Sequence, residues 1–132
     1  MNKLEESKAI VAKIIAILEA NGVVPSVLHV SNFGNEHDED RSILFSSAIS
    51  WLISEGVIRL KGDPIPDDTD DTWHYEVVLT SFGFNALARN MAGTLTLRDQ
   101  LAEAKSGQRS WSSIGDLIGG VLGGFTKTIG NG

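Results

Sequence analysis

Apolar side chains recur at intervals of three or four residues near the start of the chain, which is the spacing of a helix with one buried face. The stripe consists of Leu4, Val11, Ile14, Ile15 and Leu18, and it is widened by Ile10 and Ile17. We therefore predict a helix over residues 3–20 that is ended by Gly22. A helix that is apolar over most of its circumference needs cover on more than one side, and we expect this cover from the domain itself and from a second subunit.

Residues 23–30 and 36–55 are the next two segments with a clear pattern. In the first, Pro25 disfavours a helix, and the valine and leucine residues around it favour a short strand. In the second, Asn35 is a suitable N-cap, and the acidic residues that follow suit the first turn of a helix from Glu36 to Glu55. The expected buried stripe of this helix is Leu44, Phe45, Ala48, Ile49 and Leu52. Most of its serines then fall on the opposite side, with Trp51 at the border.

Two strand-like segments, residues 57–61 and 73–79, lie on either side of a stretch rich in aspartate, proline and glycine. This stretch contains little that could pack in a core. We therefore predict a hairpin with a long acidic tip.

Polar residues after the hairpin provide start and stop signals for two further helices. Thr80 or Ser81 can cap a helix that runs to about Arg89, and a looser helix is expected from Leu97 to Lys105. The following residues 106–109, with sequence SGQR, are typical of a linker.

The last segment combines helical periodicity with many glycines, which normally end helices. Its apolar stripe contains Trp111, Ile114, Leu117, Ile118, Val121, Leu122 and Phe125. Each glycine lowers helix stability by roughly 0.8–1 kcal/mol relative to alanine, so we expect a helix only where its apolar face is buried. The face could pack on its own domain or on a dimer mate, or it could mediate further association or contact with a membrane surface.

The length of 132 residues suits one compact domain, which we place at residues 1–105, followed by a linker and tail over residues 106–132. The chain has no cysteine, which excludes disulfide bonds and thiolate metal sites. Charged residues interrupt the apolar positions at the start, so we expect no signal peptide and a cytoplasmic location.

Two stretches, AISWLISEGVIRL and VVLTSFGFNALAR, resemble the winged-helix domains of bacterial transcription regulators. The positions that carry the resemblance are Leu52, Gly56, Val57 and Ile58, followed by Leu79, Thr80 and Gly83. The resemblance covers roughly residues 3–90 and implies an α+β fold with the order helix, short strand, helix, two-stranded wing and helix, followed here by C-terminal helices. In this arrangement Thr80 caps a helix, Gly83 allows close packing, and Leu79, Phe82 and Leu87 are expected to be buried.

The chain departs from that family in one respect. Winged-helix regulators usually have two helices between the first strand and the wing, whereas residues 31–41 offer little material for the earlier one. Either that helix is a single turn near Ser31 to Gly34, or the two helices have merged.

The resemblance implies nucleic-acid binding, but the charge distribution opposes it. The formal net charge is −6, and acids crowd the start of the second helix and the wing tip. The acidic surface that we expect to bind a partner consists of Glu36, Asp38, Glu39, Asp40, Asp67, Asp68, Asp70 and Asp71. These carboxylates repel phosphates where DNA would have to lie. We therefore expect a non-enzymatic regulatory or adaptor protein with a basic protein partner, and DNA mimicry is a sharper form of this hypothesis.

Two other interpretations of the surface remain open. An acidic surface can simply be solvated. A DNA-binding regulator of the winged-helix type would instead use Ser46, Ser47, Ser50, Arg59 and Lys61 for contact.

Histidines next to carboxylates raise the question of a metal site or a hydrolase. The segments HDED, residues 37–40, and DDTDDTWH, residues 67–74, both lack the His pair at positions i and i+4 of a helical zinc site. A calcium loop starting at Asp68 would have Trp73 where glycine is required and Leu79 where a glutamate belongs. With no phosphate loop and no nucleophile elbow, we predict no cofactor, no built metal centre and no enzyme, and only loose divalent-ion binding at the hairpin tip as an alternative.

Overall fold

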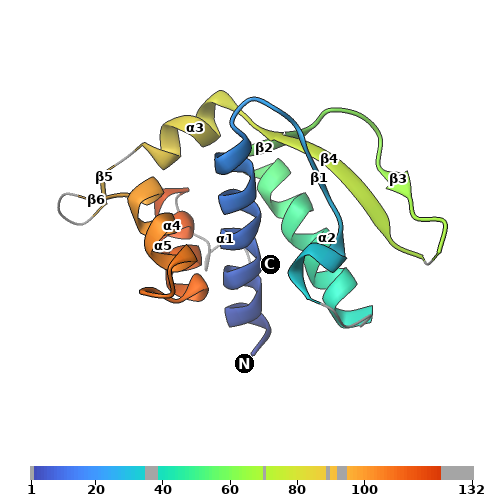
Figure 1. Cartoon of the computed structure of the whole chain (residues 1–132), viewed down its shortest axis with the longest axis horizontal. Helices are drawn as coiled ribbons and strands as arrows, with labels where there is room; N and C mark the ends of the chain where they lie inside the picture. The colour runs from blue at the N-terminus through green and yellow to red at the C-terminus, as the bar shows by residue number, and fades with distance from the viewer. Residues whose placement is uncertain (1, 35–38, 70, 89, 92–94, 123–132) are drawn as a thin grey trace.

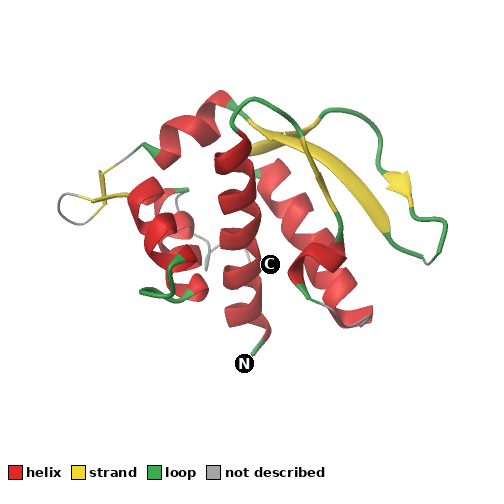
Figure 2. Ribbon diagram, viewed as in Figure 1, coloured by secondary structure: helices red, strands yellow, loops and turns green. Residues whose placement is uncertain are grey.

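The computed structural model describes residues 2–34, 39–69, 71–88, 90–91 and 95–122, and it shows an α+β fold (Figures 1 and 2). The elements, in chain order, are α1 (Lys3–Asn21), β1 (Ser26–Leu28), the 3-10 turn η1 (Val30–Phe33), α2 (Glu39–Ser54), β2 (Ile58–Leu60), β3 (Ile65–Pro66), β4 (Trp73–Leu79), α3 (Ser81–Leu87), β5 (Asn90–Met91), β6 (Leu95–Thr96), α4 (Leu97–Lys105) and α5 (Trp111–Val121). The two-stranded β5–β6 ribbon is small and separate from the main sheet.

The main sheet is antiparallel and is organised around β4. Strand β1 pairs with one side of β4, so that Leu28 lies opposite Tyr75, while β2 pairs with the other side and places Ile58 opposite Leu79. Strand β3 pairs with the beginning of β4. The predicted hairpin is thus confirmed as β2 and β4. The predicted short strand after α1 is β1, which pairs with the other side of β4.

Helix α1 lies between α2 on one side and α4 and α5 on the other (Figure 1). Its apolar residues on both sides, including Ile10, Val11, Ile14 and Ile15, are buried in one core. The expectation that α1 needs cover on more than one side is correct. That cover comes from elements of the same chain, so burial of these residues does not require a second subunit.

The segment from Gly56 to Leu87 follows the local chemistry that the sequence suggests. The Thr80 hydroxyl accepts a hydrogen bond from the Gly83 amide, at 3.0 Å, and so caps α3. A β-carbon at Gly83 would collide with the carbonyl oxygen of Val57, so only glycine fits this close approach. The expectation for Phe82 is wrong, because it is 43% exposed. Capping at Thr80 sets the phase of α3 so that Gly83, Ala86 and Leu87 face the core instead.

Helix α2 differs in detail from its prediction. It is described from Glu39 onward, and the expected cap Asn35 and start Glu36 lie outside the described residues. Trp51 does not border two faces: it is 8% exposed and belongs to the core, because the helix is covered by the sheet as well as by α1. The single helical turn considered near Ser31 is present as η1.

The glycine-rich segment forms α5, which packs along α1. Ile114 and Ile118 are buried in the common core, and a β-carbon at Gly115 would collide with the backbone of Lys8. The Lys8 ammonium group lies 2.8 Å from the Asp116 carboxylate, and this contact, followed by that with Glu5, raises the pKa of Lys8. Several partners were considered for the apolar face of this segment. In its described part, the face packs on the same chain, against α1.

Gly115 explains why a helix breaker is useful in α5. Two helices can approach with their backbones in contact only where one of them has no side chain, and the additional packing offsets the lower helix propensity. The other apolar residues expected for association, Trp111, Leu117 and Leu122, are partly buried against the same core, and Phe125 lies outside the described residues. Among the described helices, none combines the length and apolar character needed to cross a bilayer.

Candidate functional site at the base of the acidic hairpin

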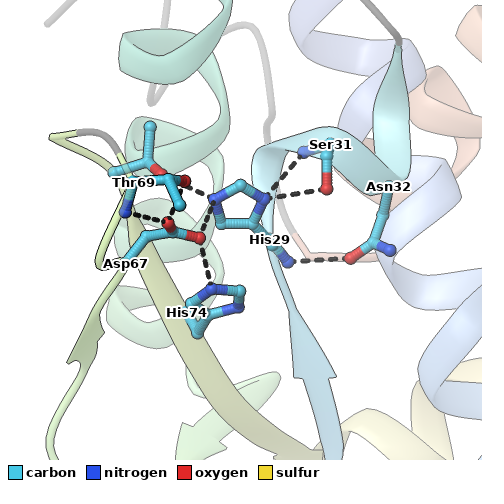
Figure 3. A network of polar contacts seen from close by, with 7 residues as sticks. His29, Ser31, Asn32, Asp67, Thr69 and His74 are labelled. Atoms are coloured by element: carbon cyan, nitrogen blue, oxygen red, sulfur yellow. Dashed lines mark hydrogen bonds and ion pairs between the residues drawn. The ribbon is translucent and has the colours of Figure 1, made fainter.

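Three side chains from separate parts of the chain meet where the segment of residues 61–74, called here the acidic hairpin, joins the sheet. They are His29, Asp67 and His74, and their ligand-type atoms all lie within 4.8 Å of one another (Figure 3). His29 follows β1, Asp67 follows β3, and His74 is the second residue of β4.

The strand register explains why the two histidines meet. The pairing of β1 with β4 ends with Leu28 opposite Tyr75, so the next residues on the two chains, His29 and His74, also lie opposite each other. Because side chains alternate along a strand and Leu28 and Tyr75 face the core, both histidines lie on the sheet face turned away from the helices. Their rings stack with centroids 4.3 Å apart and an angle of 22° between planes.

Asp67 is held between the histidines and its own turn. Its Oδ2 atom lies 2.8 Å from Nε2 of His74 and 3.6 Å from Nε2 of His29. Its Oδ1 atom accepts hydrogen bonds from the hydroxyl and the backbone amide of Thr69, at 2.6 and 2.8 Å. The hydrogen bonds from Thr69, followed by that from His74, hold the pKa of Asp67 well below its usual range. The carboxylate is therefore ionised at neutral pH.

His29 is fixed on all sides. Its backbone amide donates to Oδ1 of Asn32 at 2.8 Å, which with the ring contact to Ser31 caps the turn η1. Its Nδ1 atom lies 2.8 Å from the Ser31 hydroxyl and accepts from the Ser31 amide at 3.2 Å. On the other side of the ring, Nε2 lies 2.6 Å from the Thr72 hydroxyl. The side chain of His29 is buried, whereas that of His74 is 32% exposed, so the cluster reaches solvent through His74.

The acids expected on the partner-binding surface do not all play the same part. Asp68 and Asp71 are exposed on the acidic hairpin, and Glu39 and Asp40 are exposed at the start of α2. Asp67 is turned inward to the histidines. Glu36, Asp38 and Asp70 lie outside the described residues.

Large apolar side chains accompany the exposed acids of the hairpin. Trp73 is 45% exposed and Ile65 is 54% exposed. Ile65 pairs with His74 and Trp73 pairs with Pro66, so the two side chains lie on opposite faces of the β3–β4 ribbon. The hairpin extends past α2 at the edge of the molecule (Figure 1). It thus presents an aromatic side chain on one face and an aliphatic side chain on the other, in the same hairpin as the exposed carboxylates of Asp68 and Asp71.

The residues considered for DNA contact are not gathered on one face. Ser47 and Ser50 are exposed on α2, but Ser46 is partly buried and accepts a long hydrogen bond, 3.4 Å, from the Tyr75 hydroxyl. Arg59 pairs with Val78 and so lies on the sheet face turned away from α2. Lys61 is exposed at the beginning of the hairpin.

Comparison of the chain with protein-family models, with curated proteins and with solved structures gives no match. Sequence analysis missed the histidine cluster because it considered ligands only within one segment. Alternation in the two strands would have placed His29 and His74 on outer faces, but the pairing of β1 with β4 was needed to bring them together.

Proposed function

We propose that this protein is a non-enzymatic regulatory or adaptor protein whose acidic hairpin binds a basic surface of a partner protein. The observation that supports this function is the exposure of Trp73 on the hairpin that also carries the exposed carboxylates of Asp68 and Asp71. A partly exposed tryptophan is the side chain most typical of binding hot spots, and surrounding carboxylates steer a basic partner and fix its orientation.

The cluster at the base of the hairpin supports the same function. Asp67 is bonded to His74 and lies near His29, so the hairpin is anchored to β1 and β4 close to Trp73. A binding segment that is already held in place loses less conformational entropy when its partner docks.

The charges at the start of α2 argue against duplex DNA as the partner. The N-terminus of a helix attracts anions, but here Glu39 and Asp40 already place two carboxylates at that end. Phosphate groups would meet these carboxylates as well as those of Asp68 and Asp71. We do not extend the proposal to α5, because Ile114 and Ile118 are buried within the chain.

The test is capture of partner proteins from cell lysate on the immobilised full chain, followed by measurement of Kd with the purified partner. We expect a partner with a basic surface whose affinity falls about tenfold or more on Trp73→Ala and on the double change Asp68→Asn/Asp71→Asn. The control Glu6→Gln/Glu55→Gln alters net charge equally but lies outside the hairpin, and it should keep the affinity near wild type.

Two results would overturn the proposal. One is an equal loss of affinity in Asp68→Asn/Asp71→Asn and in the control Glu6→Gln/Glu55→Gln. That result would show that the net charge of the protein, and not the hairpin, determines the affinity. The other is retention of duplex DNA at about 0.15 M salt that is lost on Ser47→Ala/Ser50→Ala or on Arg59→Ala, which would favour the DNA-binding alternative.

A further inference from the structure

We propose that His29, Asp67 and His74 form a binding site for a divalent transition-metal ion of the zinc type. The proposal is independent of the partner-binding function. It rests on the two imidazole nitrogens and one carboxylate oxygen that converge at the base of the acidic hairpin (Figure 3).

The two distances from Asp67 to the histidines are near those that a metal ion with short bonds requires, and the two histidine nitrogens lie no more than 4.8 Å apart. Zinc binds imidazole nitrogen and carboxylate oxygen at about 2.0–2.2 Å, so two tetrahedral ligand atoms are roughly 3.3 Å apart. Oδ2 of Asp67 lies 3.6 Å from Nε2 of His29 and 2.8 Å from Nε2 of His74. The shorter of these is a hydrogen bond, and it needs to open by only about half an ångström when a metal ion replaces the proton.

The outer contacts leave one oxygen of Asp67 available, and they determine what His29 must change to bind a metal ion. Thr69 occupies only Oδ1 of Asp67, which leaves Oδ2 as a single ligand atom facing the histidines. When Nε2 of a histidine binds a metal ion, Nδ1 keeps its proton and needs an acceptor, and such acceptors orient the ring. The Ser31 hydroxyl, 2.8 Å from Nδ1 of His29, can accept that proton. Without a metal ion the Ser31 amide donates to the same nitrogen and the Thr72 hydroxyl lies 2.6 Å from Nε2, so metal binding requires His29 to move its proton to Nδ1 and to give up both contacts.

The ligand set determines the class of ion. Two borderline imidazole donors with one hard carboxylate donor suit zinc and its neighbours in the first transition row, whereas calcium and magnesium prefer oxygen ligands alone. Three protein ligands leave a further position for water or for a group from a partner. His74, which is 32% exposed, provides the side from which the ion and that ligand can enter.

The test is isothermal titration of the untagged full chain with Zn²⁺, with Mg²⁺ and Ca²⁺ as comparison ions. We expect about one equivalent of Zn²⁺ to bind, with no heat from the other two ions. His74→Gln and Asp67→Asn should each weaken binding at least about tenfold, while circular dichroism shows that both variants remain folded. His37→Gln removes the third histidine of the chain, which is not part of the cluster, and should leave binding unchanged.

NMR of the imidazole nitrogens gives a second readout that does not depend on a folded variant of the buried His29. On addition of Zn²⁺ the proton of that ring should lie on Nδ1, with Nε2 shifted by the metal. The proposal is overturned if Zn²⁺ gives no saturable binding, if binding persists unchanged in both His74→Gln and Asp67→Asn, or if His37→Gln abolishes it.

Discussion

Gly115 of α5 lies so close to Lys8 of α1 that a β-carbon at position 115 would overlap the Lys8 carbonyl group and α-carbon. The two helices therefore touch through their backbones at this point. Five residues further along, Gly120 faces open space, so the same helix contains a glycine that is required for packing and one that is not.

Gly115→Ala should lower the free energy of unfolding by about 1–3 kcal/mol, because the added methyl group forces α5 away from α1 by more than its better helix propensity recovers. Gly120→Ala should raise it by up to about 1 kcal/mol, since alanine favours the helix and meets nothing there. Urea denaturation of both variants measures the two effects. A similar stabilisation in both would show that α5 does not pack closely on α1.

Gly83→Ala should destabilise the protein by about 2–3 kcal/mol, because its methyl group meets the carbonyl oxygen of Val57, which belongs to the rigid backbone before β2. Gly62 also lacks neighbours within 4 Å, so Gly62→Ala is the matched control and should be close to neutral. Thermal unfolding followed by circular dichroism distinguishes the two. A neutral Gly83→Ala would mean that α3 can move away from β2 at little cost.

Asp67→Asn should lower stability at neutral pH and flatten its dependence on acid, when measured with a chelator present. The pKa of Asp67 is lowered in the folded protein, so its carboxylate stabilises the fold above the unfolded value of about 3.9, and this contribution declines as the pH falls below that value. The difference from wild type should therefore be largest above about pH 4 and shrink on acidification.

The control for this prediction is Asp68→Asn, which removes an exposed carboxylate from the same hairpin and should leave stability near that of wild type. Urea titrations at a series of pH values measure both variants. An identical acid profile for the two would show that the contacts of Asp67 with Thr69 and His74 do not stabilise the hairpin.

Asp116→Asn should weaken the attachment of α5 by about 1 kcal/mol at neutral pH, since it removes the closest partner of the buried Lys8 ammonium group but leaves Glu5 at 3.2 Å. The pKa of Lys8 is raised in the folded protein, so the ion pair contributes fully below the ordinary lysine value and is lost as the pH rises through the raised one. Hydrogen exchange of α5 amides provides the measurement. Unchanged protection in α5 would contradict a role for this pair in holding the helix.

Sequence patterns predict most of the local structure because local chemistry decides it. The stripe of α1, the strands of the hairpin and the Thr80 cap depend on neighbouring residues, and these predictions are confirmed. Phe82 shows where local patterns fail, because an apolar side chain does not by itself determine which side of a short helix faces the core.

Contacts between distant segments explain what the sequence could not provide. His29 and His74 meet only because β1 pairs with β4, and nothing near either residue specifies that pairing. In the same way, the apolar stripe and glycines of α5 indicate that the helix needs a partner, but not that the partner is α1. The sequence contains each residue of the candidate site, but their proximity could not be predicted from it.

The packing of α5 on α1 joins the last described helix of the chain to the first. During synthesis α1 leaves the ribosome before α2, the sheet, α3 and α4, and only then does the segment that covers this side of α1 emerge. Contacts so far apart in sequence slow folding, and an uncovered apolar helix is open to association in the meantime. We therefore expect chains that end before Trp111 to associate more readily than chains that include α5.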